Sequence, residues 1–89
     1  MAFWVYILQS RRDGAYYVGQ TGSVEERLRR HNANSEPGTR GKGPWQVVYR
    51  EEFQTRGEAM AREKQIKSRK KRKFIEGIVD STRGVAQPG

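Results

Sequence analysis

Cysteine is absent from this 89-residue chain, which excludes a disulfide framework, a thiolate nucleophile and a cysteine-ligated zinc site. Histidine occurs once, at His31, so a metal cluster of several histidines is also excluded. No apolar run approaches the ~20 residues of a membrane-spanning helix, and the apolar start lacks the basic flank and cleavage site of a signal peptide. We expect a cytoplasmic protein with no membrane partner.

Acidic residues are fewer than basic ones, and the imbalance is local. Eighteen Lys and Arg against ten Asp and Glu give a net charge of +8. Residues 62–73 contain eight bases and one acid, whereas residues 1–61 carry +2 and residues 74–89 carry −1. Such a concentrated positive field attracts a polyanion, and nucleic acid is the first candidate. The alternative is a basic helix that maintains solubility or contacts anionic lipid.

The length and the 34% share of hydrophobic residues permit one small domain with a modest core. We expect this domain to occupy residues 1–80. Residues 81–89 contain too few apolar side chains to pack, and we expect them to form a flexible C-terminal tail.

Three segments have the composition of β-strands. The segment Phe3–Gln9 is apolar on both alternating positions, which predicts a central strand covered on both faces. The Asp13-Gly14 turn and the following segment Tyr16–Gln20 predict an antiparallel hairpin, in which Gly19 interrupts the second strand near its end. The segment Trp45–Phe53 predicts a third strand.

Two capping boxes mark the starts of helices. Ser23 and Glu26 open a helix over about Val24–His31, and residues 55–58 repeat the pattern before a second helix. Apolar residues in the segment Phe74–Val79 share one face of a third helical segment. The predicted fold is therefore of the α/β (α+β) class, with the order strand, strand, helix, strand, helix, helix.

One acidic residue conflicts with the apolar pattern of the second helix. Glu63 lies at helical spacing among Ala59, Met60 and Ile66, which places a carboxylate in the core-facing stripe. An inward carboxylate is costly unless it is paired or bound to a cation. One explanation is an ion pair with Lys67, four residues later, which contributes about 0.3–0.5 kcal/mol. The other is a metal site, because Mg²⁺ often takes only one or two protein carboxylates.

A set of polar and aromatic residues has the composition that phosphodiester cleavage needs. Tyr6 and Tyr17 lie on the two paired strands, and Arg27 and His31 lie four residues apart on the first helix. Each tyrosine taken alone would be a core residue. Cleavage requires a base for the nucleophile, positive charge for the transition state and stabilisation of the leaving oxygen, and these groups with Glu63 would supply all three.

The tripeptides Trp4-Val5-Tyr6 and Tyr17-Val18-Gly19 resemble the two signature tripeptides of the GIY-YIG nuclease superfamily, although Trp4 stands where the pattern has glycine. The segments YVGQTGSVEERLRRHN, VVYREEF and EAMAREKQIK resemble the small stand-alone bacterial members, and the resemblance extends from Phe3 to Lys67. It implies a three-stranded antiparallel sheet flanked by helices and a metal-dependent endonuclease with one Mg²⁺ or Mn²⁺ ion.

The resemblance also implies a role for each site residue. Tyr17, or the water that it orders, is associated with nucleophile activation, and Arg27 with the scissile phosphate. Tyr6 helps to position the site, His31 assists proton transfer or orientation, and Glu63 holds the metal. Several restriction and repair members add an asparagine after the glutamate, and residues 70–80 contain none.

DNA is the expected substrate, with RNA as the alternative, and recognition is expected to depend on nucleic-acid structure rather than sequence, as in repair or recombination. A protein partner that supplies targeting is a further expectation. The alternative hypotheses for the function are a non-catalytic nucleic-acid-binding module and a nuclease subunit that needs a partner. The expected contacts to nucleic acid come from the loop over residues 32–44 and from the basic segment. They are Arg40, Lys42, Lys64, Lys67, Arg69, Lys70, Lys71, Arg72 and Lys73.

Overall fold

The computed structural model describes residues 2–33, 41–69 and 71–86, with side chains up to residue 80. It contains three strands and three helices in the predicted order, so the predicted α+β class is confirmed. The elements are β1 (Phe3–Ser10), β2 (Tyr16–Thr21), α1 (Val24–Asn32), β3 (Trp45–Phe53), α2 (Arg56–Arg69) and α3 (Arg72–Ala86).

The strands form one antiparallel sheet in the order β2-β1-β3, so β1 is the central strand as predicted. In the pairing with β2, Tyr6 lies opposite Gly19. In the pairing with β3, Ile7 lies opposite Tyr49 and Leu8 opposite Val47, which leaves Val48 as an extra residue in a β-bulge.

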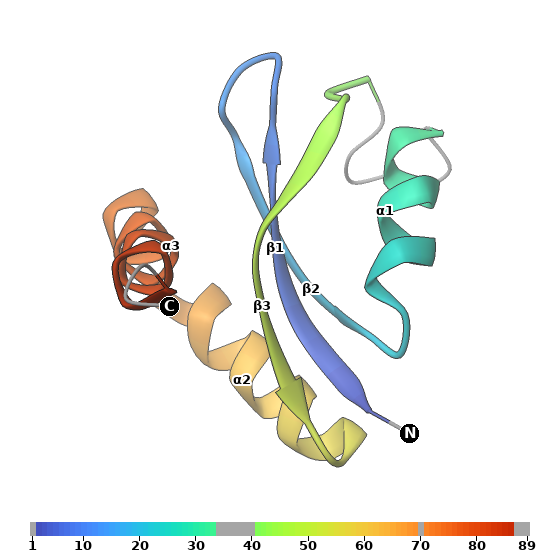
Figure 1. The fold of residues 1–89 in the computed structure, drawn as a ribbon, viewed down its shortest axis with the longest axis vertical. Coiled ribbons are helices and arrows are strands. Elements are labelled where there is room, and N and C mark those ends of the chain that lie inside the picture. The colour runs from blue at the N-terminus through green and yellow to red at the C-terminus, as the bar shows by residue number, and fades with distance from the viewer. Residues whose placement is uncertain (1, 34–40, 70, 87–89) are drawn as a thin grey trace.

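Helices cover both faces of the sheet, with α1 on one face and α2 and α3 on the other (Figure 1). Because strand side chains alternate, β1 contributes to both layers. Tyr6 and Leu8 pack with Val24 of α1, and we call this side the α1 face. The opposite side, the α2/α3 face, has a buried cluster of aliphatic residues. These are Val5, Ile7, Val18, Ala59, Ile66 and Val79.

The two predicted capping boxes differ in the structure. At α2, the Glu58 amide donates to the Thr55 hydroxyl and the Thr55 amide donates to the Glu58 carboxylate, each at 3.2 Å. At α1, the Glu26 amide donates to Ser23 at 3.3 Å, but the Glu26 carboxylate pairs with Arg30. The Ser23 amide donates instead to the Thr21 hydroxyl. The box is therefore complete at α2 and half formed at α1.

Two expectations on α2 and α3 differ from the structure. Met60, expected on the apolar face of α2, has 50% of its surface exposed, because the buried face of the helix is centred on Ala59 and Ile66. The expected boundary at residue 80 falls inside α3, which continues to Ala86, and residues 87–89 lie outside the described part. Among the described residues, no helix combines the length and apolar character needed to cross a membrane.

Candidate active site

Three predicted site residues from three elements come together on the α1 face. The Tyr6 hydroxyl from β1 and Nε2 of His31 from α1 are hydrogen-bonded at 3.2 Å, with the donor set by the histidine tautomer. The ring of Tyr17 from β2 lies 4.6 Å from the His31 ring and 6.2 Å from the Tyr6 ring, measured between centroids. The sheet and α1 therefore assemble one cluster from residues 25 positions apart.

Burial divides this cluster into an inner and an outer part. The side chains of Tyr6 and His31 have no exposed surface, whereas Tyr17 is half-buried. A group that reaches a macromolecular substrate needs an accessible atom. Tyr17 is therefore the accessible member of this trio, whereas the Tyr6–His31 pair is buried.

Gly19 makes the close packing of the two tyrosines possible. A Cβ built on Gly19 would lie 2.6 Å from the Tyr6 hydroxyl oxygen and 3.1 Å from Cε1 of Tyr17. From the sequence, this glycine is interpreted as an interruption of the strand and as the last residue of the second signature tripeptide. A glycine inside a strand also marks a place where another group approaches the backbone closely, and that is its role here.

Asn32 fixes the end of α1 that carries His31, and sequence reasoning missed it. Its side-chain oxygen accepts a hydrogen bond from the Trp45 amide at 2.6 Å, and its Nδ2 donates to the Trp45 carbonyl at 3.3 Å. The rings of Trp45 and Tyr17 are in turn packed in a T-shaped arrangement with their centroids 6.5 Å apart. Asn32 thus ties the helix to the first residue of β3, beside the cluster. The only signal in the sequence was its position directly after His31.

Arg27 lies one helical turn before His31 on α1, as the spacing predicts. Its side chain is half-buried, and its Nε atom is buried. A guanidinium keeps its charge at every accessible pH and presents a planar fork that matches two phosphate oxygens. Arg27 is therefore a half-buried positive group one helical turn from His31.

Glu63 and Lys67 connect α2 to this cluster across the edge of the sheet. Oε2 of Glu63 and Nζ of Lys67 are 2.9 Å apart, so the ion pair that the spacing allowed is present. The Glu63 side chain is only 22% exposed and that of Lys67 is 50% exposed. Nζ of Lys67 also lies 5.7 Å from the centre of the Tyr17 ring, a cation–π distance. The carboxylate is thus partly covered and close to the accessible tyrosine.

The donors around Glu63 limit the kind of metal site that is compatible with the structure. The described residues contain no group of three or more His, Cys, Asp or Glu side chains that would hold an ion by themselves. A single hard carboxylate oxygen fits Mg²⁺ or Mn²⁺ that keeps most of its waters and takes further oxygens from a phosphate. Glu63 is compatible with an ion of this kind and not with a closed structural site.

Apart from Lys67, the predicted nucleic-acid contacts fall into three groups. Three lysines are exposed and make no ion pair among the described side chains: Lys64, Lys71 and Lys73. Lys42, three residues before the start of β3, is also exposed. Their ammonium groups are available for phosphates. Two further predicted residues, Arg40 and Lys70, lie outside the described part of the chain.

The remaining two predicted arginines make contacts inside the fold. The guanidinium of Arg69 lies 5.2 Å from the centre of the Phe74 ring. That of Arg72 lies 5.0 Å from the Tyr16 ring, and its Nε pairs with Glu76 at 3.0 Å. These contacts dock α3 against α2 and the β1–β2 hairpin, so a phosphate would compete with them.

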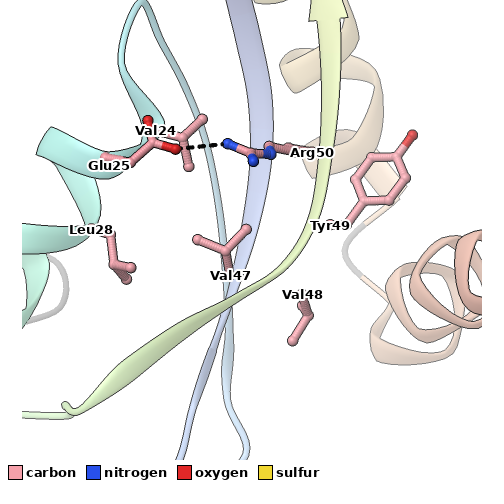
Figure 2. Close-up of a pocket in the computed structure, with 7 residues that line it drawn as sticks. All are labelled: Val24, Glu25, Leu28, Val47, Val48, Tyr49 and Arg50. Carbon is pink, nitrogen blue, oxygen red and sulfur yellow. Dashed lines mark hydrogen bonds and ion pairs between the residues drawn. The ribbon is translucent and has the colours of Figure 1, made fainter.

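A separate pocket of about 350 Å³ lies between α1 and β3 and contains none of the predicted site residues. In Figure 2, Leu28 and Val47 line its apolar part, and a 2.9 Å ion pair between Glu25 and Arg50 closes one side. The pKa of Glu25 is held below its usual range, first by a hydrogen bond from its own backbone amide and then by Arg50. Its polar groups are the Tyr49 phenol and the paired Glu25 and Arg50, and it is separate from the cluster of Tyr6, Tyr17 and His31.

Several known proteins that are similar to this chain share the name UPF0213. A UPF0213 protein of Haloquadratum walsbyi is 46% identical over 66 residues, which cover 73% of each chain. A UPF0213 protein of Natronomonas pharaonis is 38% identical over 80 residues, 89% of this chain and 93% of that protein. The solution NMR structure of a UPF0213 protein from Bacillus halodurans is similar with a TM-score of 0.51 and 35% identity, covering 85% of this chain and 84% of that one.

The GIY-YIG catalytic domain family matches residues 2–76. This range includes β1, β2, α1, β3 and α2, and therefore the whole cluster from Tyr6 to Lys67. Because the match covers most of the sequence and all of the candidate site, the chain belongs to the GIY-YIG catalytic domain family.

Proposed function

We propose that this protein is a metal-dependent endonuclease that hydrolyses phosphodiester bonds in DNA and selects its substrate by structure rather than by sequence. The observation that carries the proposal is the convergence of Tyr17, the Tyr6–His31 pair and Glu63 at one edge of the sheet. Membership of the GIY-YIG catalytic domain family supports the same reaction class.

Tyr17 is the proposed group that orients and activates the nucleophile, because its ring is accessible and touches both His31 and Lys67. A free tyrosine has a pKa near 10, so nearby positive charge is needed for it to act as a base at neutral pH. Tyr6 and His31 are positioning residues in this scheme. Both are fully buried and hydrogen-bonded to each other, and their rings pack against the Tyr17 ring.

Arg27 is the proposed ligand of the scissile phosphate. Its permanent charge would stabilise the extra negative charge that develops on the phosphoryl oxygens in the transition state. Glu63 would hold one Mg²⁺ or Mn²⁺ ion, which supplies Lewis-acid stabilisation of the phosphoryl and leaving oxygens when bound. The exposed Lys64, Lys71 and Lys73 would bind the backbone on either side.

The test is a cleavage assay with labelled duplex, single-stranded, flapped and four-way DNA, together with a matched RNA duplex, in Mg²⁺ or Mn²⁺. We compare the wild-type protein with Glu63→Gln and Arg27→Ala. We expect metal-dependent cleavage of one or more DNA shapes and a loss of about 10²–10³-fold in each variant, with DNA binding retained.

Two results would overturn this proposal. Binding of DNA without cleavage of any substrate would identify a non-catalytic binding module or a subunit that needs a partner. Cleavage that persists unchanged in both variants would indicate a contaminating nuclease. Binding measured against salt adds a second check, because each phosphate contact contributes about −0.9 to the slope of log affinity against log salt.

A further inference from the structure

Lys67 holds a position that its assignment to the DNA-binding surface does not explain. Its Nζ lies 2.9 Å from Oε2 of Glu63 and 5.7 Å from the centre of the Tyr17 ring. Lys67 is therefore in contact with both of these site residues. The side chain is half exposed, so the ammonium also borders solvent.

The carboxylate that Lys67 contacts is the group that, in the proposed function, would hold a divalent ion. A partly covered carboxylate requires a cation, and the ammonium satisfies this requirement on Glu63. A divalent ion on the same oxygen would repel the ammonium, because two positive charges within a few ångströms raise each other's energy. The flexible four-carbon stem of lysine allows the ammonium to move without disturbing α2.

We propose that Lys67 is an exchangeable counter-cation of Glu63, which neutralises the carboxylate until a divalent ion displaces it. This inference rests on the proposed function, in which Glu63 is the metal ligand. On displacement, the ammonium stays beside the Tyr17 ring and becomes available for a substrate phosphate. Lys67 therefore lowers the affinity of the protein for the divalent ion. When no divalent ion is bound, the ammonium neutralises the charge of the Glu63 carboxylate.

The experiment measures Mn²⁺ affinity by electron paramagnetic resonance of the free ion, without DNA. Lys67→Met removes the charge and keeps an unbranched side chain with good helix propensity that still covers Tyr17. Lys64→Met is the matched control, because it removes the same charge three residues earlier on the same helix, and no ion pair between Lys64 and Glu63 is present among the described residues. Glu63→Gln, alone and combined with Lys67→Met, tests whether the effect depends on the carboxylate.

We expect Lys67→Met to bind Mn²⁺ about tenfold more tightly than the wild type and Lys64→Met to bind it nearly as the wild type does. In the Glu63→Gln background the effect of Lys67→Met should vanish. An unchanged or weaker affinity in Lys67→Met would overturn the inference, and so would an equal gain in Lys64→Met, which would report net charge alone.

Failure of the proposed function gives a different pattern. If the Mn²⁺ shift occurs as expected but no DNA or RNA is cleaved, the inference stands and the nuclease proposal is overturned. If Glu63→Gln binds Mn²⁺ as tightly as the wild type, Glu63 is not the ligand and both are overturned. Circular dichroism of each variant establishes that the fold is retained in every comparison.

Discussion

The two faces of the sheet differ in kind, although the same central strand supplies both. On the α2/α3 face, β1 contributes Val5 and Ile7 to a buried cluster that is entirely aliphatic. On the α1 face, it contributes Tyr6 to a cluster in which His31 is fully buried. An aliphatic cluster is stabilised by burial alone, whereas a buried tyrosine and histidine need a hydrogen bond to offset their desolvation. The alternating side chains of β1 therefore place an aliphatic core on one face and the Tyr6–His31 pair on the other.

The largest expected effect comes from damage to the aliphatic face. Ile66 is fully buried in this cluster, so Ile66→Ala removes packed surface and leaves a cavity. We expect a loss of about 2–5 kcal/mol in the free energy of unfolding, measured by urea denaturation. The control is Met60→Ala on the exposed side of the same helix, which should change stability by no more than about 0.5 kcal/mol. Equal losses in the two variants would refute the assignment of the core.

The next largest effect on stability is expected on the α1 face, where a substitution disturbs the close packing of side chains rather than the burial of apolar surface. In Gly19→Ala the new methyl group meets the Tyr6 hydroxyl and the Tyr17 ring, at built distances of 2.6 and 3.1 Å. The rings must shift, and we expect a loss of about 1–3 kcal/mol in unfolding free energy together with reduced cleavage. Gly57→Ala serves as the control because a Cβ there meets no atom within 4 Å. A Gly19→Ala protein with wild-type stability would show that the rings are not tightly packed.

The fold could be predicted from local patterns because each element has its own signal. The apolar segment Phe3–Gln9 indicated the central strand, and the boundaries of β3 were predicted to the residue. The capping residues located the starts of α1 and α2 within one residue. The position of Met60 was wrong because it lies near the border of the buried stripe of α2, where periodicity alone does not separate covered from exposed positions.

The composition of the site could be predicted from the sequence, but the exposure of each side chain could not. The resemblance indicates which residues belong to the site and gives no information on their burial. The meeting of Tyr6, Tyr17 and His31 was expected, but their division into buried and accessible groups depends on how α1 packs against the sheet. The link between Asn32 and Trp45 joins residues 13 positions apart through a side chain and backbone, and no sequence period encodes such a contact. The Glu63–Lys67 pair was one of two explanations offered, and the structure shows it.

A smaller effect is expected when only the hydrogen bond on the α1 face is removed. Tyr6→Phe keeps the ring and deletes the hydroxyl that contacts Nε2 of His31. We expect a loss of about 1 kcal/mol in unfolding free energy and a change in the imidazole ¹⁵N shifts of His31. Combined with Gly19→Ala, the loss should be less than the sum of the two single losses, because the hydroxyl is the closest atom to the new methyl group. Strict additivity would argue against direct contact.

The smallest effect concerns a titratable group that borders the aliphatic face. Burial, followed by the nearby charge of Glu51, raises the pKa of Tyr49 above its ordinary value near 10. Below that value the phenol is neutral in both the folded and the unfolded chain, and it contributes no pH dependence. Above it the unfolded chain loses the proton first, so the folded state holds more protons and stability falls as pH rises through the folded pKa. We expect the stability of the wild type to fall more steeply than that of Tyr49→Phe between pH values of about 9 and 11, measured by urea denaturation. Parallel curves would show that ionisation of Tyr49 does not affect folding.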